Sequence, residues 1–132
     1  MSKPNPTDRL YSKDHEWLKN EGDGAATVGI TDYAQEMLTD IVFVELPEIG
    51  KKIKRGETMA VVESVKSVSE VYAPASGEII KTNKILEETP ELINKDAFGE
   101  GWIAKIKLAD ASELKALLDA AAYEKLAKEG KR

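Results

Sequence analysis

One lysine stands out by its position in a short polar segment between two stretches that are rich in β-branched residues. The segment 63–70 reads Glu-Ser-Val-Lys-Ser-Val-Ser-Glu, with Lys66 near its centre. It predicts the tip of a β-hairpin from which Lys66 projects into water. A type I′ turn would force the β-branched Val65 to a positive φ, so we expect a type I turn or a longer loop. The segment by itself does not distinguish Lys66 from an ordinary surface lysine.

Other side chains that carry out chemistry are scarce. The chain has no cysteine, which excludes disulfides, thiol nucleophiles, iron–sulfur clusters and cysteine-based zinc sites. Its one histidine, His15, excludes any site that needs two imidazoles. The pair His15-Glu16 lacks the second histidine of a zinc-binding helix and falls in a predicted strand. We therefore expect neither a metal site nor a catalytic centre.

The composition is that of a folded, acidic domain. With 132 residues, the chain has about the length of one usual domain of ~150 residues. The 19 Lys and Arg against 24 Asp and Glu give a net charge of −5, which disfavours a nucleic-acid-binding protein. The basic run 51–55 has no interleaved aromatic residues and is typical of a solvated turn; docking to an acidic patch on a partner enzyme is the alternative.

Two further features bear on the location of the protein. The most apolar stretches, 41–44 and 59–62, are far shorter than the ~20 residues of a membrane-spanning helix. Residues 1–10 contain Asp8 and no apolar run, so they resemble neither a secretory signal nor a transit peptide. The predicted location is the cytoplasm, away from membranes.

Most of the chain has the pattern of short β-strands. Strands are expected at 15–20, 25–30, 40–46, 58–64, 70–72, 78–86 and 102–108. Short strands separated by turns indicate a barrel or a sandwich.

Three helices are expected beside these strands. Asp32 and Gln35 form a capping box that begins a short helix, and a single helical turn is expected from 89–90 onward. A second capping box, Asp110 with Glu113, begins a C-terminal helix of about 111–129. We expect the apolar face of this helix to cover the sheet. That face consists of Leu114, Leu117, Leu118, Ala121 and Leu126.

Several motifs along the chain resemble those of the glycine cleavage system H proteins. The segment 63–67, followed by Tyr-Ala-Pro at 72–74 and Ser-Gly-Glu at 76–78, is similar to the lipoyl-lysine signature of that family. The other motifs are Asp-His-Glu-Trp at 14–17, Val-Gly-Ile-Thr-Asp-Tyr-Ala-Gln at 28–35, Val-Phe-Val-Glu-Leu-Pro at 42–47 and Gly-Glu-Gly-Trp at 99–102. They follow the order and spacing of the family from about residue 10 to the final helix.

The resemblance implies a fold that agrees with the strand pattern. It is mainly β, a barrel-sandwich hybrid or hammerhead of the lipoyl-domain type, with short helices and a C-terminal amphipathic helix. A single lipoyl-carrier domain would span residues 1–132, with a hammerhead core of about 25–108 and the helix at about 111–129.

The resemblance also implies a function in glycine catabolism and one-carbon metabolism. Lys66 would carry lipoate in amide linkage, and the monomeric, non-catalytic chain would act as a shuttle. It would take an aminomethyl group from the glycine decarboxylase (P protein) to the tetrahydrofolate-dependent aminomethyltransferase (T protein). The dihydrolipoyl dehydrogenase (L protein) would reoxidise the arm, and lipoylating enzymes would be further partners.

Four other functions are alternatives to this one. Biotin carriers usually place the target lysine between methionines, whereas Lys66 lies between Val65 and Ser67. Lipoyl domains of 2-oxoacid dehydrogenase acyltransferases typically have Asp before the lysine and belong to longer chains with flexible linkers. A purely structural interaction module would carry no modification. An H-like relay protein that donates lipoate to other lipoyl enzymes stays open as the alternative function.

Residues around Lys66 are candidates for two further roles, recognition by the lipoylating enzymes, which must select one lysine from many, and protection of the loaded arm. The lipoylating enzymes are expected to recognise the hairpin through Glu63, Val65, Ser67, Glu70 and Gly77. The resemblance implies a protective cleft for the loaded arm with a polar wall of Asp14, Glu16 and Glu70, whose carboxylates attract an ammonium group. The alternative is that all three acids are solvated surface residues. Glu70 departs from the aspartate that is usual in the family.

Overall fold

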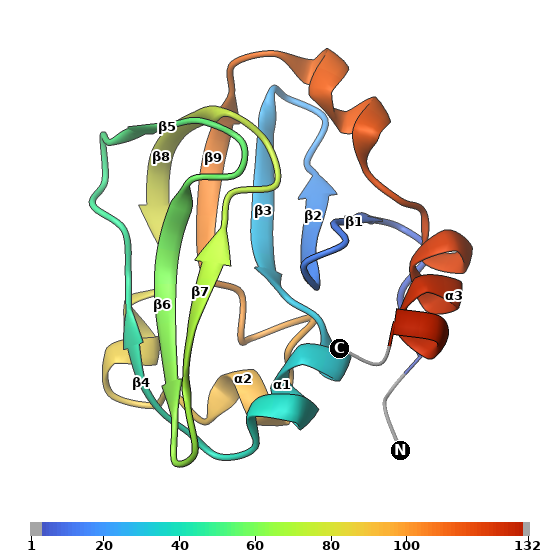
Figure 1. Ribbon diagram of the computed structural model, residues 1–132. Coiled ribbons are helices and arrows are strands. Elements are labelled where there is room, and N and C mark those ends of the chain that lie inside the picture. Colours follow the sequence, from blue (N-terminus) through green and yellow to red (C-terminus); the bar gives the residue numbers. More distant parts are fainter. Residues whose placement is uncertain (1–3, 131–132) are drawn as a thin grey trace.

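In the computed structural model, which describes residues 4–130, two antiparallel β-sheets pack face to face (Figure 1). The strands are β1 Leu10–Tyr11, β2 Glu16–Asn20, β3 Ala25–Ile30, β4 Ile41–Glu45, β5 Lys52–Ile53, β6 Thr58–Ser64, β7 Val68–Tyr72, β8 Gly77–Thr82 and β9 Ala104–Leu108. The helices are α1 Asp32–Leu38, α2 Leu92–Lys95 and α3 Ala120–Gly130, with 3₁₀ helices η1 Lys84–Glu87 and η2 Ala111–Ala116. The six-stranded sheet has the order β1-β2-β3-β9-β8-β5, and the three-stranded sheet has the order β4-β6-β7.

The main core lies between the two sheets. Alternate residues of the central strands, such as Val28 of β3 and Ile106 of β9, are fully buried there. They pack with residues of the smaller sheet, such as Val62 of β6 and Val71 of β7. This alternation is the period-2 pattern from which the strands were predicted, and the observed architecture is accordingly made mainly of β-strands.

A second, aromatic cluster lies under the C-terminal helix α3. It consists of fully or almost fully buried Tyr11, Trp17 and Tyr123, and the Tyr11 and Tyr123 rings stack with their centres 4.9 Å apart. The Tyr123 hydroxyl lies 2.8 Å from His15 Nδ1 and 2.7 Å from Thr31 Oγ1. The helix therefore packs beside β1 through one anchored tyrosine.

The continuous helix expected at 111–129 is instead two pieces, η2 and α3. The chain leaves the helical path because Leu118 and Tyr11 exchange two backbone hydrogen bonds, each 2.7 Å long. The predicted apolar face is also wrong in part, since Ala121 is exposed and Tyr123, which was not included, is buried. A strand-like contact has overridden local helix propensity at this point.

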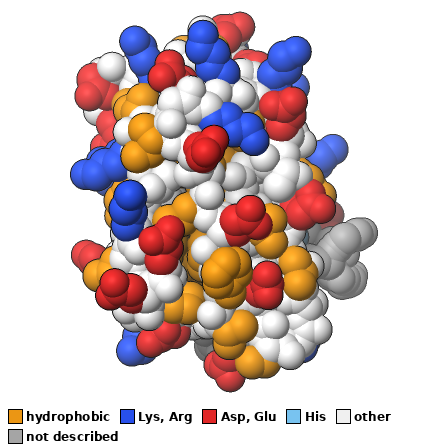
Figure 2. Space-filling view, turned by 90° about the vertical axis from the view of Figure 1, so that its left-hand side faces the viewer, with side chains coloured by type: hydrophobic (Ala, Val, Ile, Leu, Met, Phe, Trp, Pro, Cys, Tyr) orange, Lys and Arg blue, Asp and Glu red, His pale blue; other side chains and the backbone are white. Residues whose placement is uncertain are grey.

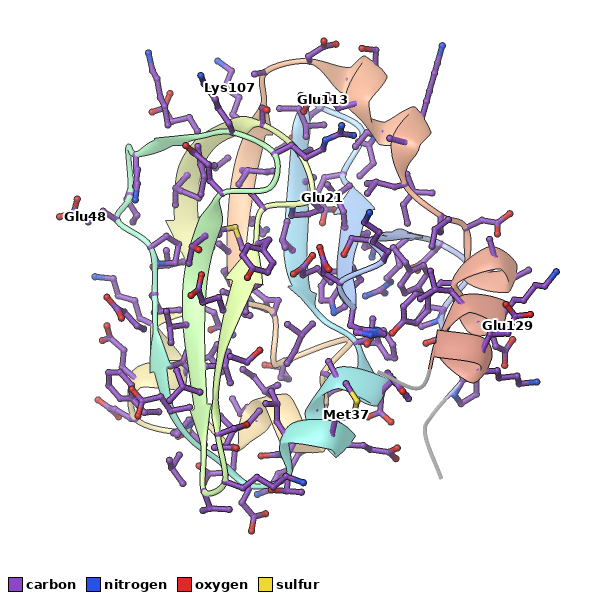
Figure 3. All side chains as sticks on the ribbon, in the orientation of Figure 1. Glu21, Met37, Glu48, Lys107, Glu113 and Glu129 are labelled. Carbon is purple, nitrogen blue, oxygen red and sulfur yellow. The ribbon has the colours of Figure 1, made fainter. Side chains whose placement is uncertain are left out.

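Both predicted capping boxes are wrong in detail. The N-cap of α1 is Thr31, whose hydroxyl accepts from the Ala34 N–H. Asp110 caps η2, but the Glu113 carboxylate accepts from the Ser76 N–H at 2.6 Å and from the Ser76 hydroxyl at 3.0 Å. Glu113, at the top of the molecule in Figure 3, thereby joins η2 to the turn before β8.

Other boundaries also differ from the expected ones. The strands expected at 40–46, 70–72 and 102–108 are observed at 41–45, 68–72 and 104–108. The strand expected at 78–86 ends at Thr82, because the Asn83 side chain turns to donate to the carbonyls of Glu100 and Trp102. The helical turn expected from 89–90 begins later, as α2. His15 lies before β2 with a positive φ of 73° and is not part of the strand. None of the helices in residues 4–130 has the length and hydrophobicity to cross a bilayer.

Candidate functional site

Lys66 lies at the tip of the β6–β7 hairpin, at the lower end of the molecule near α1, which carries Met37 (Figure 3). Neither Val65 nor Lys66 has a positive φ, as the β-branched Val65 led us to expect. The Ser64 hydroxyl accepts from the N–H groups of Lys66 at 3.2 Å and Ser67 at 3.1 Å. Ser64 was not among the predicted site residues, although a serine that bonds to the backbone two and three residues ahead is a common turn signal.

The hairpin tip is also fixed from outside. The Val65 N–H donates to the carbonyl of Asp40, which lies just before β4, at 3.0 Å. The Lys66 side chain is exposed and makes no hydrogen bond or ion pair within residues 4–130. The tip thus presents a free amine on an immobilised backbone.

Replacing Ser64 by alanine tests the internal bracing of the tip. The change removes the acceptor for two N–H groups, so the amides of Lys66 and Ser67 are expected to exchange hydrogen faster. The free energy of unfolding should fall by only about 1 kcal/mol, because exposed N–H groups find water instead. Hydrogen exchange followed by NMR measures both effects, with Ser69→Ala as the control. Unchanged exchange at both amides would contradict this role of Ser64.

Four of the predicted recognition residues belong to the hairpin. Glu63 is the last residue but one of β6 and lies opposite Val68 of β7, while Val65 and Ser67 flank Lys66 and are exposed. Glu70 lies farther from the tip on β7, opposite Val61, and its carboxylate accepts from the Thr58 hydroxyl. Glu63, Val65 and Ser67 therefore lie together around Lys66, whereas Glu70 lies toward the middle of the strand.

Gly77 lies far from this tip, at the start of β8. It pairs with Ile53 of β5 and Leu108 of β9. A Cβ added at Gly77 would come within 2.3 Å of the Lys107 carbonyl oxygen, a distance that requires the backbone to shift. The structure therefore gives this glycine a packing role, independent of any enzyme.

Gly77→Ala is accordingly expected to destabilise the fold by about 1–3 kcal/mol, the usual cost of overpacking. Denaturant unfolding measures this loss. The rate of lipoylation, corrected for the folded fraction, should remain that of the wild type. A variant that is as stable as the wild type but poorly modified would instead assign Gly77 to enzyme recognition.

A cleft of about 470 Å³ opens beside the far end of β7. Its lining includes Asp14, Glu16, Tyr72 and Leu117, but Glu70 is not among the lining residues. Two of the three predicted wall residues thus meet at one cleft, while Glu70 lies elsewhere on the strand. At about 3.3 Å per residue, the six steps from Lys66 to Tyr72 span at most about 20 Å of chain, of which β7 itself begins at Val68.

Glu16 is a buried bridge between the two sheets. Its side chain is almost inaccessible, and its carboxylate accepts from the Ser12 hydroxyl at 2.5 Å and from the Tyr72 N–H at 2.9 Å. Burial raises the pKa of Glu16 to about 7, although both hydrogen bonds act in the opposite direction. The neighbouring Asp14 is exposed and contributes to the same rise. Of the two acids at the cleft, Asp14 is therefore the one that faces solvent.

The side of the molecule next to β4 is apolar and acidic. The register between β4 and β6 shifts between Ile41 and Phe43, so that the consecutive residues Val42 and Phe43 are both about half exposed. Figure 2 shows hydrophobic side chains in the lower half of this face, among acidic ones, with several Lys and Arg toward the top. A protein that approached the hairpin from this side would meet apolar groups and carboxylates.

Comparison with known proteins agrees with this arrangement. The family model described as glycine cleavage H-protein matches residues 9–130. The chain belongs to the glycine cleavage H-protein family. Glycine cleavage system H proteins of Shigella dysenteriae serotype 1 and Cronobacter sakazakii are 55% and 54% identical to it over 121 residues, which cover 92% of this chain and 94% of each relative.

A solved structure extends the likeness to the fold. The crystal structure of a glycine cleavage system H protein from Mycobacterium marinum matches with a TM-score of 0.84 and 38% identity, over 97% of this chain and all of that one. The prediction of a mainly β, lipoyl-domain-like barrel-sandwich hybrid with short helices and a C-terminal helix is therefore confirmed. Glycine cleavage H proteins are lipoate carriers.

Proposed function

We propose that this H-family protein carries lipoate in amide linkage on Lys66 and acts as the shuttle of the glycine cleavage system. The observation that carries the proposal is the exposed Lys66 amine at a hairpin tip that Ser64 and the Asp40 carbonyl hold in place. Acylation of an amine needs access and no competing partner, and Lys66 has both within residues 4–130. Lys66 and the hairpin tip that holds it therefore fit a lipoyl group in amide linkage.

The division of labour follows from this geometry. When bound, lipoate supplies the sulfur that carries an aminomethyl group from the P protein to the T protein, and the dithiol that the L protein reoxidises. The chain itself contributes no catalytic group: its hairpin fixes the base of the arm. A flexible arm on a fixed base keeps the cargo at a high effective concentration near each enzyme in turn.

The surrounding acids are assigned different parts in this proposal. Glu63, Val65 and Ser67 lie close enough to Lys66 for a lipoylating enzyme bound at Lys66 to contact them. Glu70 is the member of the recognition set on the hairpin that lies farthest along β7 from Lys66. Asp14 is the carboxylate that would face a cationic cargo in the cleft, because Glu16 is buried and holds two structural hydrogen bonds. Glu16 contributes by fixing the wall of the cleft.

Mass spectrometry tests the assignment directly. The protein is produced in cells that are supplied with lipoate, and its intact mass and peptides are analysed. One lipoyl group per chain is expected, located entirely on Lys66. Lys84, another exposed lysine next to a turn, is the internal control and should remain unmodified. Lipoate on any other lysine, or a chain that acquires none while a known H protein in the same cells is modified, would overturn the proposal.

A further inference from the structure

Three lysines form a row across the outer face of the six-stranded sheet. Lys19 of β2 lies opposite Thr27 of β3, and Thr27 lies opposite Lys105 of β9. Lys105 in turn lies opposite Lys81 of β8. We call these three lysines the basic row. Their strand neighbours, such as Ile106, are buried in the core, so the basic row faces away from the three-stranded sheet (Figure 1).

An irregularity in β8 brings Lys81 into the row. Ile79 pairs with Ile106, but after a register shift it is Lys81, and not Ile80, that pairs with Lys105. A regular ladder would place Ile80 opposite Lys105. Bulges re-aim side chains and are frequent beside functional sites. Two like charges directly opposite each other destabilise a sheet, so an anion that contacted both lysines would relieve their repulsion.

The basic row lines a hollow of about 340 Å³ that has an aromatic border. Lys105 Nζ lies 5.7 Å from the ring centre of Trp102. The Arg9 guanidinium lies 4.6 Å from the ring centre of Trp17 and donates to the Phe98 carbonyl at 2.8 Å. Trp17 is itself almost fully buried. The ammonium groups of the basic row therefore lie beside aromatic rings, of which the Trp17 ring is held in place by burial.

Positive charge is in excess at this hollow, although the whole chain is acidic. Among the described residues that line it, Glu21 alone is acidic. Asp8, just outside, lies 3.8 Å from Lys19. Lys81 and Lys105 have no acidic partner at ion-pair distance in the described part of the chain. The end of the basic row at β8 and β9 is thus the part that lacks a counter-charge.

We propose that the basic row and its aromatic border form a docking surface for an acidic segment of another protein. Small-molecule pockets are mostly apolar, whereas four of the ten residues that line this hollow are Lys or Arg. Lys19 and Lys81 are three strand spacings apart, about 14 Å, which suits several carboxylates along a segment better than one small anion. Aromatic and arginine side chains beside a charged rim are typical of protein interfaces.

Docking at this surface would leave the hairpin free. The basic row lies on the sheet that does not contain β6 and β7, and it faces away from them. A partner that held the chain by its basic row would therefore not cover Lys66. The proposal does not depend on lipoylation of Lys66, so it can be tested on the unmodified chain and can fail without affecting the carrier function.

NMR titration of the ¹⁵N-labelled chain at low ionic strength tests the surface. The probe is an acetylated, amidated hexaglutamate peptide, with hexaglutamine as the uncharged peptide and tripolyphosphate as the small anion. Saturable shifts are expected at the amides of Thr27, Lys81 and Lys105 and at the Trp102 indole N–H. Binding should weaken as salt is added, because exposed charges are screened.

A pair of charge-matched variants separates the surface from net charge. Lys81→Gln/Lys105→Gln is expected to weaken hexaglutamate binding about tenfold, since two exposed ion pairs are lost. Lys51→Gln/Lys84→Gln removes the same charge elsewhere and should weaken it less than about twofold. Absence of saturable shifts, equal losses in both variants, or tighter binding of tripolyphosphate than of hexaglutamate at the same residues would each overturn the proposal.

Discussion

Lys66→Arg is expected to leave no activity in glycine–carbon dioxide exchange with the P protein, down to the background rate without this chain. Arginine keeps the positive charge, but its guanidinium is not a substrate for amide formation with lipoate. Thermal unfolding should be unchanged within about 0.5 kcal/mol, because the Lys66 side chain is exposed and has no partner within residues 4–130. The combination of full stability and no activity is the signature of a lost attachment point.

The matched control for this experiment is Lys84→Arg. Lys84 is also exposed, and it lies in η1, outside the hairpin. This variant should be lipoylated and should support exchange at the rate of the wild type. A Lys66→Arg chain that still supports exchange would place the lipoyl group elsewhere, and an inactive Lys84→Arg chain would show that the assay responds to general surface changes.

The hairpin could be predicted because its determinants are local. The strand expected at 58–64 is observed with the same bounds, as β6, since its apolar pattern and the polar segment after it lie within a few residues. The β-branched Val65 also predicted correctly that the tip is not a type I′ turn, since Val65 has no positive φ. By contrast, the tip hydrogen bond to Asp40 joins residues that are 25 positions apart, and no local pattern indicates it.

The elements that were predicted wrongly depend on contacts across the fold. Glu113 has the spacing of a capping box, but it bonds to Ser76, which only the folded chain brings near. The break between η2 and α3 follows from the pairing of Leu118 with Tyr11. Local propensity is a weak guide where a tertiary hydrogen bond competes for the same group.

The candidate site and the basic row also depend on contacts across the fold that no local pattern indicates. Glu70 was expected in the cleft, but its strand position directs its carboxylate to Thr58 instead. The basic row exists only because the register of β8 shifts at Ile80, and a register shift cannot be located without the partner strand.

Glu16→Gln is expected to remove a pH dependence of stability that the wild type shows between about pH 4.5 and 7. Burial raises the pKa of Glu16 from its ordinary value of 4.5 to about 7 in the folded chain. In this range the folded state binds more protons than the unfolded state, so the free energy of unfolding falls as pH rises. A pKa difference of this size lowers the free energy of unfolding by about 3 kcal/mol between a pH below 4.5 and a pH above 7.

Glutamine is the suitable replacement because its amide oxygen can still accept from the Tyr72 N–H, while it cannot ionise. The free energy of unfolding is measured by denaturant titration at a series of pH values, and the wild type is compared with the variant at each pH. The difference, wild type minus Glu16→Gln, should fall by about 3 kcal/mol from pH 4.5 to pH 8. The control is Asp14→Asn, a change at the exposed acid of the same cleft. The difference in free energy of unfolding, wild type minus Asp14→Asn, should show no comparable fall over this pH range.

The sign and size of this fall show whether burial or hydrogen bonding has the larger effect on the pKa of Glu16, which joins the two sheets near the cleft. A difference that does not change with pH would mean that the hydrogen bonds from Ser12 and Tyr72 fully offset the burial of the Glu16 carboxylate. A difference that rises with pH would mean that these bonds outweigh burial and that ionised Glu16 stabilises the fold. The expected fall instead identifies Glu16 as a bridge between β2 and β7 that stabilises the fold when neutral and destabilises it when ionised.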